Sequence, residues 1–208
     1  MGLALFFAAG LAQAQPVAGV EYRELSPAQP TDTAGKIEVI EFFWYGCPHC
    51  YNFEPVLGPW VKKMPKDTQF RRIPAIFNNE WEKSARAYYA LEAIGEGERL
   101  HQPLFDAIHQ NTRLNVANEA ALTEWLGKQG VDTKKFAAAY RSFSVEGKIN
   151  RAKQLTQAYK IEGVPAMAVN GKYVILTDNI KSFDRMVEVA DYLIEQSRKQ
   201  SGKAAPKK

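Results

Sequence analysis

The chain is poor in cysteine and histidine and has no long hydrophobic run. Its 208 residues include two cysteines and three histidines. So few thiols and imidazoles exclude a disulfide framework, an iron–sulfur protein and an all-cysteine structural zinc site. The apolar runs are too short to span a bilayer as helices, and a hydrophobic content of 46% excludes a disordered or collagen-like chain. At this length we expect one domain, or one domain with a sizeable insertion.

Excess charge of one sign is confined to the C-terminus. The chain has 27 basic and 23 acidic side chains, a net charge of +4. Residues 198–208 hold five of the basic residues and no acid, which leaves 22 basic against 23 acidic elsewhere. We expect this Lys-, Ala-, Gly- and Pro-rich segment to be a disordered, solvated tail. The near-neutral remainder shows no basic groove motif, so nucleic-acid binding is not expected.

Residues 1–14 resemble a secretory signal peptide. The segment is uncharged, and the apolar run from Leu3 to Ala9 is followed by Ala-Gln-Ala at 12–14, the small-x-small pattern of a signal-peptidase site. We expect the exported protein to begin near Gln15 and to reach an oxidising compartment, where a disulfide can persist. Signal peptides ordinarily begin with Lys or Arg, and the first basic residue here is Arg23, which leaves open a natural start further upstream.

The first strand and the first helix are predicted on either side of Gly46. Residues 37–44 are apolar at nearly every position, as in a strand buried on both faces. Pro48 then suits the first position of a helix, where its missing N–H costs nothing. We expect that helix to reach about Lys63 and to be bent or interrupted near Pro55 and the following Gly-Pro pair.

A block of helices is predicted in the middle of the chain. A second strand is expected over residues 70–76, at an edge or a bulge because Pro74 cannot donate a backbone hydrogen bond. Residues 79–143 carry only helical patterns, with Asn118 and Asp132 as helix caps. The block therefore separates two strand-bearing segments, as an inserted subdomain would.

The rest of the chain completes an α/β pattern. Ser144 is predicted to cap a long helix, and Asn170-Gly171 is a strong two-residue hairpin signal between two short strands. An amphipathic helix is expected from Ser182 to about Ser197. The predicted layout is an α/β domain in two parts, residues 15–78 and 144–197, with a helical insertion at residues 79–143.

Cys47 and Cys50 lie where the first strand gives way to the helix. At the helix start, unpaired backbone N–H groups and the helix dipole favour a Cys47 thiolate. Cys50 follows one turn later, so the two sulfurs can form a disulfide. We expect Cys50 to be more buried, with the higher pKa, and Cys47 to be the reacting sulfur. His49 can add a hydrogen bond or positive charge near Cys47, and a stabilised thiolate makes the disulfide a stronger oxidant.

Less reactive roles for the cysteines fit the sequence poorly. A c-type haem site needs His directly after the second cysteine, and Tyr51 stands there. A zinc site needs two more ligands, and we expect His101 and His109 to be exposed helix residues without function. A structural disulfide would close so small a loop that its entropic benefit would be minimal. The sequence therefore favours a redox-active cysteine pair and no metal site.

Two segments far apart in the chain carry a joint signal. They are Glu-Phe-Phe-Trp-Tyr-Gly-Cys-Pro-His-Cys at 41–50 and Gly-Val-Pro-Ala-Met-Ala-Val-Asn-Gly-Lys-Tyr at 163–173. Together they resemble the DsbA family of bacterial periplasmic thiol oxidases. The resemblance covers essentially the whole exported chain. It implies a thioredoxin-like α/β fold with an inserted all-helical subdomain, a periplasmic location, and the acidic cysteine and oxidising disulfide known for this family.

The resemblance also implies a reaction and its partners. Reduced, unfolded exported proteins would be oxidised through a mixed disulfide at Cys47, and a DsbB-like quinone-linked membrane oxidase would restore the Cys47–Cys50 disulfide. No metal or organic cofactor is required in the chain, and we expect a monomer. Two alternatives stay open. One is a reductase or isomerase, although no segment is left over for the dimerisation domain usual in isomerases. The other is a chaperone-like binding protein in which the disulfide is merely present.

Val164 and Pro165 gain a role only through the resemblance. It implies that Pro165 is cis and lies opposite the Cys47 disulfide, whereas the residues alone predict only a turn before a strand. Backbone groups of Val164 would then pair with an extended substrate, and Val164 resembles the residue of the oxidases at a position that tunes redox behaviour. We also expect Trp44 and Tyr45 to line an apolar substrate groove.

Glu41 is an unusual charge in a nearly all-apolar strand. It shares a face with Val39 and Phe43, so we expect a partly buried carboxylate. One interpretation is a charge at the sheet edge that pairs with Arg71 or Arg72 of the next strand. The resemblance implies the other, a buried carboxylate that assists proton transfer at Cys50. Both interpretations stay open at this stage.

Overall fold

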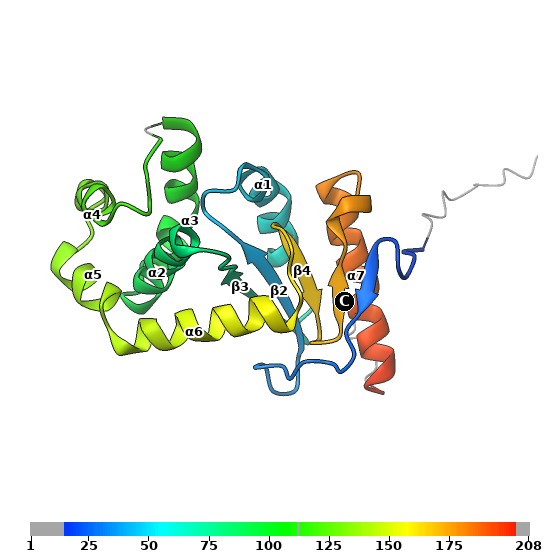
Figure 1. Cartoon of the computed structure of the whole chain (residues 1–208). Coiled ribbons are helices and arrows are strands. Elements are labelled where there is room, and N and C mark those ends of the chain that lie inside the picture. The colour runs from blue at the N-terminus through cyan, green and yellow to red at the C-terminus, as the bar shows by residue number, and fades with distance from the viewer. Residues whose placement is uncertain (1–14, 112, 203–208) are drawn as a thin grey trace, which may run out of the picture.

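A mixed β-sheet forms the centre of the structure, a computed structural model that describes residues 15–111 and 113–202. The sheet has strand order β1-β5-β4-β2-β3 (Figure 1). Its strands are β1 (Tyr22–Glu24), β2 (Ile37–Phe43), β3 (Thr68–Pro74), β4 (Ala166–Val169) and β5 (Tyr173–Ile175). β2 runs parallel to β3 and antiparallel to β4. β3 is thus an edge strand, as Pro74 predicts. β2 is internal, so Glu41 does not lie at a sheet edge.

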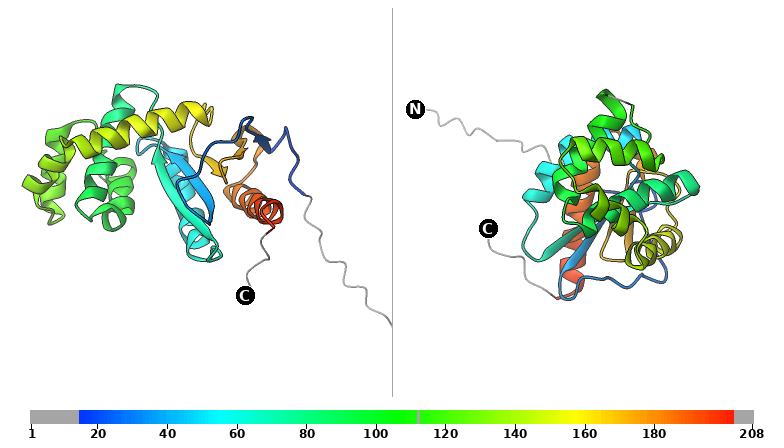
Figure 2. Two further views of the ribbon diagram at one scale, coloured as in Figure 1. Left: turned by 90° about the horizontal axis from the view of Figure 1, so that it is seen from below. Right: turned by 90° about the vertical axis from the view of Figure 1, so that its left-hand side faces the viewer.

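Helices cover both faces of the sheet. α1 (Pro48–Lys62) and α7 (Phe183–Gln200) pack on one face, and α6 (Phe143–Ala158) and α2 (Asn79–Ala93) pack on the other (Figure 2). Successive side chains of β2 point to opposite faces. Val39 therefore shares a buried cluster with Leu57 of α1 and Leu193 of α7, whereas Ile40 shares one with Ile149 of α6. None of the helices in the described residues combines the length and apolar character needed to cross a bilayer.

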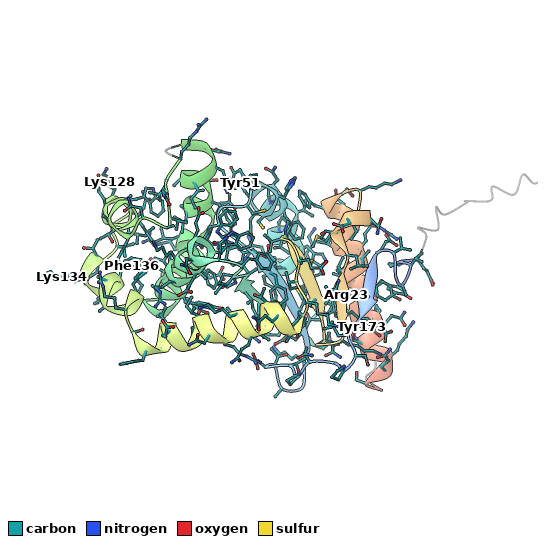
Figure 3. The ribbon with its side chains drawn as sticks, viewed as in Figure 1. Arg23, Tyr51, Lys128, Lys134, Phe136 and Tyr173 are labelled. Atoms are coloured by element: carbon teal, nitrogen blue, oxygen red, sulfur yellow. The ribbon has the colours of Figure 1, made fainter. Side chains whose placement is uncertain are left out.

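The helical insertion has its own core beside the sheet. It consists of α2, α3 (Gly97–Asp106), a π-helical turn (Ala107–Asn111), α4 (Glu119–Lys128) and α5 (Thr133–Tyr140). Asn118 and Asp132 cap α4 and α5 as predicted, each side chain accepting two backbone N–H bonds. Figure 3 shows Phe136 among these helices, well away from Tyr173 on the sheet. Phe43 and Tyr45 extend from the end of β2 into this core.

α1 is not interrupted near Pro55, so of the bend or interruption predicted there, the interruption is wrong. The helix continues through Pro55 and Pro59 as far as Lys62. An internal proline costs a helix about 3 kcal/mol or more. Burial of Phe53 and Leu57, both 0% exposed in the cluster between the sheet and α7, offsets this cost.

Two predicted helix boundaries are also wrong. α6 is capped by Ser142 and not by Ser144, because the Ser142 hydroxyl accepts the Val145 N–H at 3.2 Å. The predicted tail does not begin at residue 198, because α7 continues to Gln200. Arg198 is 2% exposed and donates to Asp67 at 2.7 and 2.9 Å. This ion pair ties the last turn of α7 to the segment before β3. The predicted signal peptide and residues 203–208 of the predicted tail lie outside the described residues.

The predicted hairpin turn is confirmed at Asn170 and Gly171. Both residues have positive φ, 53° and 66°, and the Val169 carbonyl accepts the Lys172 N–H at 3.1 Å. A Cβ atom on Gly171 would lie 2.0 Å from the backbone oxygen of Gln29. Glycine is therefore required here both by backbone conformation and by close approach of another segment.

Replacing Gly171 with alanine tests this requirement. We expect Gly171→Ala to lower the free energy of unfolding by about 1–3 kcal/mol, because it adds a clash to a strained φ. The matched control is Gly147→Ala in α6, where an added Cβ meets open space. This variant should raise the free energy of unfolding by about 0.5–1 kcal/mol. Denaturant unfolding measures both, and equal effects of the two variants would contradict the expectation.

Candidate active site

Cys47 is the N-cap of α1, and Pro48 occupies the first helical turn as predicted. The Cys47 sulfur accepts the backbone N–H of Cys50 at 3.4 Å. Both cysteines are free thiols in the structure, and Cys47 is 7% exposed whereas Cys50 is 0% exposed. The helix start thus holds one sulfur near the surface and buries the other one turn further on.

The two cysteines have opposite shifts in pKa. The hydrogen bond from the Cys50 thiol, the backbone N–H groups of Cys50 and His49, and the charge of His49 together lower the pKa of Cys47 to about 6, against the effect of burial. Burial and the neighbouring Cys47 sulfur raise the pKa of Cys50. At pH 7 the reduced pair therefore consists of a Cys47 thiolate and a protonated Cys50. The sequence predicts the contributions of the helix start and of His49 but not the largest one, the hydrogen bond from the Cys50 thiol.

Val164 and Pro165 face the reactive cysteine from the turn before β4. The peptide bond between them is cis, and the Val164 carbonyl oxygen lies 3.4 Å from the Cys47 sulfur. Residues 117 positions apart in the chain thus meet at the active site. The sequence alone predicted a turn here, and only the resemblance placed it opposite Cys47.

A cavity of about 590 Å³ opens beside this turn. It is bounded by α1, by the Val164–Pro165 turn and by the start of α7, with His49 and Phe183 among its walls. Neither Trp44 nor Tyr45 borders this cavity. Tyr45 does not line a groove as expected, because it is 1% exposed in the core of the insertion. The ring of Trp44 stacks on that of Trp81 of α2, with centroids 4.3 Å apart, and its expected place in a substrate groove stays a prediction.

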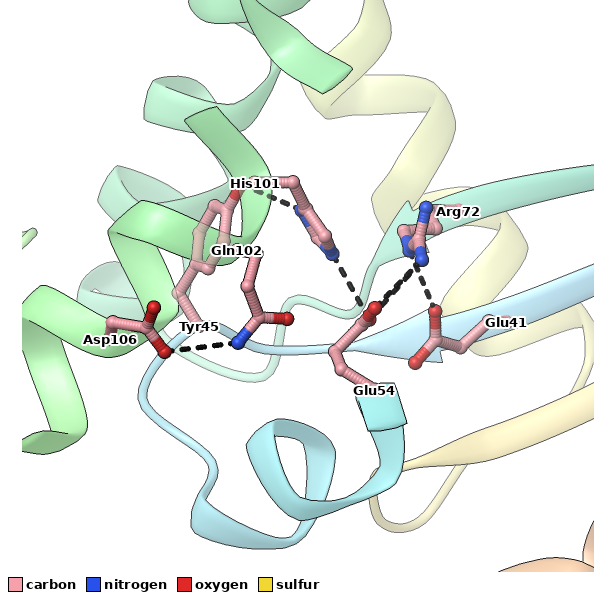
Figure 4. A network of polar contacts seen from close by, with 7 residues as sticks. All are labelled: Glu41, Tyr45, Glu54, Arg72, His101, Gln102 and Asp106. Atoms are coloured by element: carbon pink, nitrogen blue, oxygen red, sulfur yellow. Dashed lines mark hydrogen bonds and ion pairs between the residues drawn. The ribbon is translucent and has the colours of Figure 1, made fainter. Parts of the chain in front are cut away.

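Glu41 is buried and pairs with Arg72, so one feature of each interpretation is present, although Glu41 does not lie at a sheet edge. It is 0% exposed and accepts a hydrogen bond from Nε of Arg72, on β3, at 3.1 Å (Figure 4). Burial raises the pKa of Glu41 to about 8 in spite of the Arg72 charge. Its other oxygen, Oε1, has no hydrogen-bond partner among the described residues. Arg71, the other candidate partner, instead pairs with Glu38 at 2.7 Å. Glu41 is thus a buried acid that holds a proton at neutral pH.

His101 and His109 are not exposed helix residues, contrary to expectation. His101 is 7% exposed, with Nδ1 3.0 Å from the Tyr45 hydroxyl and Nε2 3.1 Å from Glu54. His109 donates from Nε2 to the Tyr45 carbonyl at 2.8 Å. The signal for burial was helical spacing, since Phe105 lies four residues from each histidine on one apolar face. Within the described part of the chain, no cluster of His, Cys, Asp or Glu could hold a metal ion.

The sequence profile of the DSBA-like thioredoxin domain family matches residues 38–188. The chain belongs to this family. The match spans both cysteines, the cis proline and the whole helical insertion. As a family member the protein is a thiol:disulfide oxidoreductase with a thioredoxin-like fold, and Cys47 and Cys50 provide its CXXC pair.

Named relatives and solved structures agree with the family assignment. The thiol:disulfide interchange protein DsbA of Pseudomonas aeruginosa is 42% identical over 87% of this chain and 85% of its own length. The Burkholderia cepacia protein of the same name is 42% identical over 93% of each chain. The crystal structure of Pseudomonas aeruginosa DsbA superimposes with a TM-score of 0.86, covering 90% of this chain and 97% of the other.

The origin of the low Cys47 pKa in this family member can be tested with Cys50→Ala. Losing the Cys50 thiol removes the largest favourable contribution, so the pKa of Cys47 should rise from about 6. His49→Ser should raise it too, because a positive charge is lost. Ultraviolet thiolate absorbance of the reduced proteins against pH measures the midpoint, and Cys47→Ser should show no thiolate in this range. An unchanged midpoint in Cys50→Ala would contradict the assignment.

Proposed function

We propose that the protein oxidises the dithiols of reduced, unfolded exported proteins in the periplasm by donating its Cys47–Cys50 disulfide. The observation that carries this proposal is the unequal environment of the two sulfurs. A Cys47 pKa of about 6 means that the reduced enzyme is stabilised as a thiolate at neutral pH. Stabilising the reduced form makes the disulfide a stronger oxidant. This favours donation of the disulfide to substrate dithiols over reduction of substrate disulfides.

The reaction proceeds by two thiol–disulfide exchanges. A substrate thiolate attacks the Cys47 sulfur, the Cys47–Cys50 bond breaks, and Cys50 leaves as a thiolate that takes up a proton. A second substrate thiolate then attacks the substrate sulfur of the mixed disulfide, and Cys47 leaves as a thiolate. The substrate loses two electrons and gains a disulfide, and the cysteine pair gains the two electrons. Attack falls on Cys47 because Cys50 is fully buried.

Glu41 is proposed to donate a proton to Cys50 and to accept it back. The Glu41 charge raises the pKa of Cys50, so the two groups interact electrostatically. A protonated Glu41 can supply the proton when Cys50 leaves as a thiolate, and an ionised Glu41 can accept it when Cys50 must attack during reoxidation. A carboxyl group with a pKa of about 8 is suited to both directions near neutral pH.

Val164 and Pro165 are proposed to align the substrate. An extended segment next to the Val164 backbone would bring its cysteine to Cys47, as in strand addition. The neighbouring cavity, with Val56, Ile180 and Phe183 in its walls, would accept apolar side chains that flank the substrate cysteine. Unfolded chains expose such side chains, whereas folded proteins bury them.

Each turnover leaves the enzyme reduced, so a second oxidant must accept two electrons. We propose that this oxidant is a DsbB-like quinone-linked membrane enzyme, which exchanges disulfides with the same Cys47 and requires no metal or organic cofactor in this chain. The monomer can perform both half-reactions, because Cys47, Cys50, Glu41 and the Val164–Pro165 turn all belong to one chain.

The reduction potential of the cysteine pair tests the direction of the reaction. Equilibration with glutathione buffers should give a potential more oxidising than that of glutathione, because the Cys47 thiolate stabilises the reduced form. A potential below that of glutathione would instead indicate a reductase.

Cys47→Ser tests the mixed disulfide at Cys47, and this variant should abolish oxidation of a model dithiol peptide. If this variant still oxidised the peptide, the mixed disulfide at Cys47 would be ruled out, and unaltered function in cells without both cysteines would indicate a chaperone-like role.

Replacement of Glu41 tests its proposed role in reoxidation. When oxidised glutathione reoxidises the reduced enzyme, the rate of Cys50 attack should rise as pH increases through about 8, where Glu41 ionises. In Glu41→Gln this rise should disappear, and the Cys47–glutathione mixed disulfide should persist at least about tenfold longer. Acid quenching and mass spectrometry measure the intermediate. The control is Glu38→Gln, a buried carboxylate on the opposite face of β2 that pairs with Arg71. Equal effects in both variants would contradict the role.

A further inference from the structure

A single guanidinium serves two buried carboxylates beneath the active site. Arg72 donates from Nε to Glu41 at 3.1 Å and from a terminal nitrogen to Glu54 of α1 at 2.9 Å. Glu41 is 0% exposed and Glu54 is 7% exposed. His101, from α3 of the insertion, reaches the other oxygen of Glu54 at 3.1 Å, and Tyr45 contacts the far side of its ring (Figure 4). These hydrogen bonds and ion pairs form one continuous series from the insertion to the sheet.

The charges of this cluster do not balance when both acids are ionised. Arg72 contributes one positive charge and the two carboxylates contribute two negative charges. An uncompensated charge is costly at a buried site, and carboxylates that share a site retain a proton between them. One proton therefore stays on Glu41 or Glu54, and the surrounding hydrogen bonds decide which of them carries it.

The contacts of His101 are consistent with one neutral tautomer. Its Nε2 lies 3.1 Å from Glu54. The pKa of Glu54 is lowered, and an ionised carboxylate can only accept, so Nε2 carries the hydrogen. Its Nδ1 then accepts from the Tyr45 hydroxyl at 3.0 Å. Burial lowers the pKa of His101, in keeping with a neutral ring. His101 is therefore a fixed hydrogen-bond donor to Glu54 and makes no such contact with Glu41.

The two carboxylates differ accordingly. Burial acts to raise the pKa of Glu54. The hydrogen bond from His101, the positive charge that His101 carries when it is protonated, and the charge and hydrogen bond of Arg72 bring that pKa below its usual value. Burial dominates at Glu41 and raises its pKa. Glu41 has Oε1 without a hydrogen-bond partner among the described residues, a position where a proton can reside. The hydrogen-bond geometry and the opposite directions of the two pKa shifts thus agree in favouring an ionised Glu54 and a protonated Glu41.

We propose that His101 is a positioning residue that keeps the shared proton on Glu41, within electrostatic reach of Cys50, by holding Glu54 in its ionised form. The inference rests on the proposed function insofar as Glu41 exchanges that proton with Cys50. It gives the helical insertion a part in the chemistry, because α3 controls the protonation of a carboxyl group on β2 through Glu54 of α1.

Other groups also act on these sites and must be followed in any titration. Those that act on Glu41 are Arg72 of β3, Glu54 of α1 and Cys47. Cys50, Tyr45 and Tyr88 of α2 also interact with its charge. Those that face His101 are Glu54, Arg72 and Glu98, together with the hydroxyl of Tyr45.

The test compares His101→Phe with His101→Gln in the reduced, full-length protein. Phenylalanine keeps an aromatic ring among Phe43, Tyr45 and Phe105, which all contact the His101 ring, but it cannot donate to Glu54. Glutamine can donate to Glu54 and accept from Tyr45. Carbon-13 NMR of the glutamate carboxyl groups against pH measures Glu41 and Glu54 separately.

We expect His101→Phe to raise the pKa of Glu54 and to lower the pKa of Glu41 by about one to two pH units, the worth of a hydrogen bond to a charged group. His101→Gln should restore most of the difference. An unchanged Glu41 pKa in His101→Phe, or the same change in both variants, would overturn the proposal.

A double variant guards against a purely structural effect. In a Glu54→Gln background, Glu54 can no longer compete for the proton, so adding His101→Phe should leave the Glu41 pKa unchanged. An additional shift of the same size would show that His101 acts on Glu41 by another route and would overturn the proposal. Near-ultraviolet circular dichroism confirms that each variant is folded.

The pH profile of reoxidation separates this inference from the proposed role of Glu41. If the Glu41 pKa falls in His101→Phe and the rise in the rate of Cys50 attack moves to lower pH with it, both hold. If the pKa falls and the rate profile does not move, the positioning role of His101 is supported and the role of Glu41 in proton transfer fails.

Discussion

The structure depends on the start of one helix. Cys47 caps α1, where free backbone N–H groups stabilise a thiolate, and the helix carries Cys50 one turn deeper into the protein. Two identical side chains thereby acquire opposite acidities, one with a pKa of about 6 and one with its pKa raised. In the proposed reaction, this asymmetry determines which sulfur is attacked and which leaves. The surrounding fold serves to hold the helix start against the Val164 turn and to keep water from Cys50.

The helical insertion is integrated with the active site. Tyr45, two residues before Cys47, is held through its hydroxyl by His101 and through its carbonyl by His109. The same His101 contacts Glu54, which shares Arg72 with Glu41. An insertion that only covered the sheet would bury apolar side chains at this junction. Instead, His101 contacts Glu54 in a cluster with one cation and two acids, and His109 donates to the backbone of Tyr45.

Local signals predicted most of the fold and the chemical centre of the site. Helix caps and tight turns depend on neighbouring residues, so they could be predicted from the sequence. Examples are the caps Asn118 and Asp132 and the turn at Asn170-Gly171. Errors arose where a distant partner overrides local preference. Pro55 does not break α1 because Phe53 and Leu57 are anchored in the core, and Arg198 extends α7 because Asp67 pairs with it. The histidines were misjudged because their partners lie in other elements.

The cysteine pair and its position at a helix start could be predicted from neighbouring residues, because spacing and backbone chemistry are local. The proline opposite the pair was predicted only through the family resemblance. The sharing of the proton depends on contacts that form only in the folded chain. Glu41, Glu54, Arg72 and His101 come from β2, α1, β3 and α3, and no local pattern reveals that they meet. The pKa of each depends on burial and on the charges that the others bring within contact, so their protonation is a property of the assembled fold.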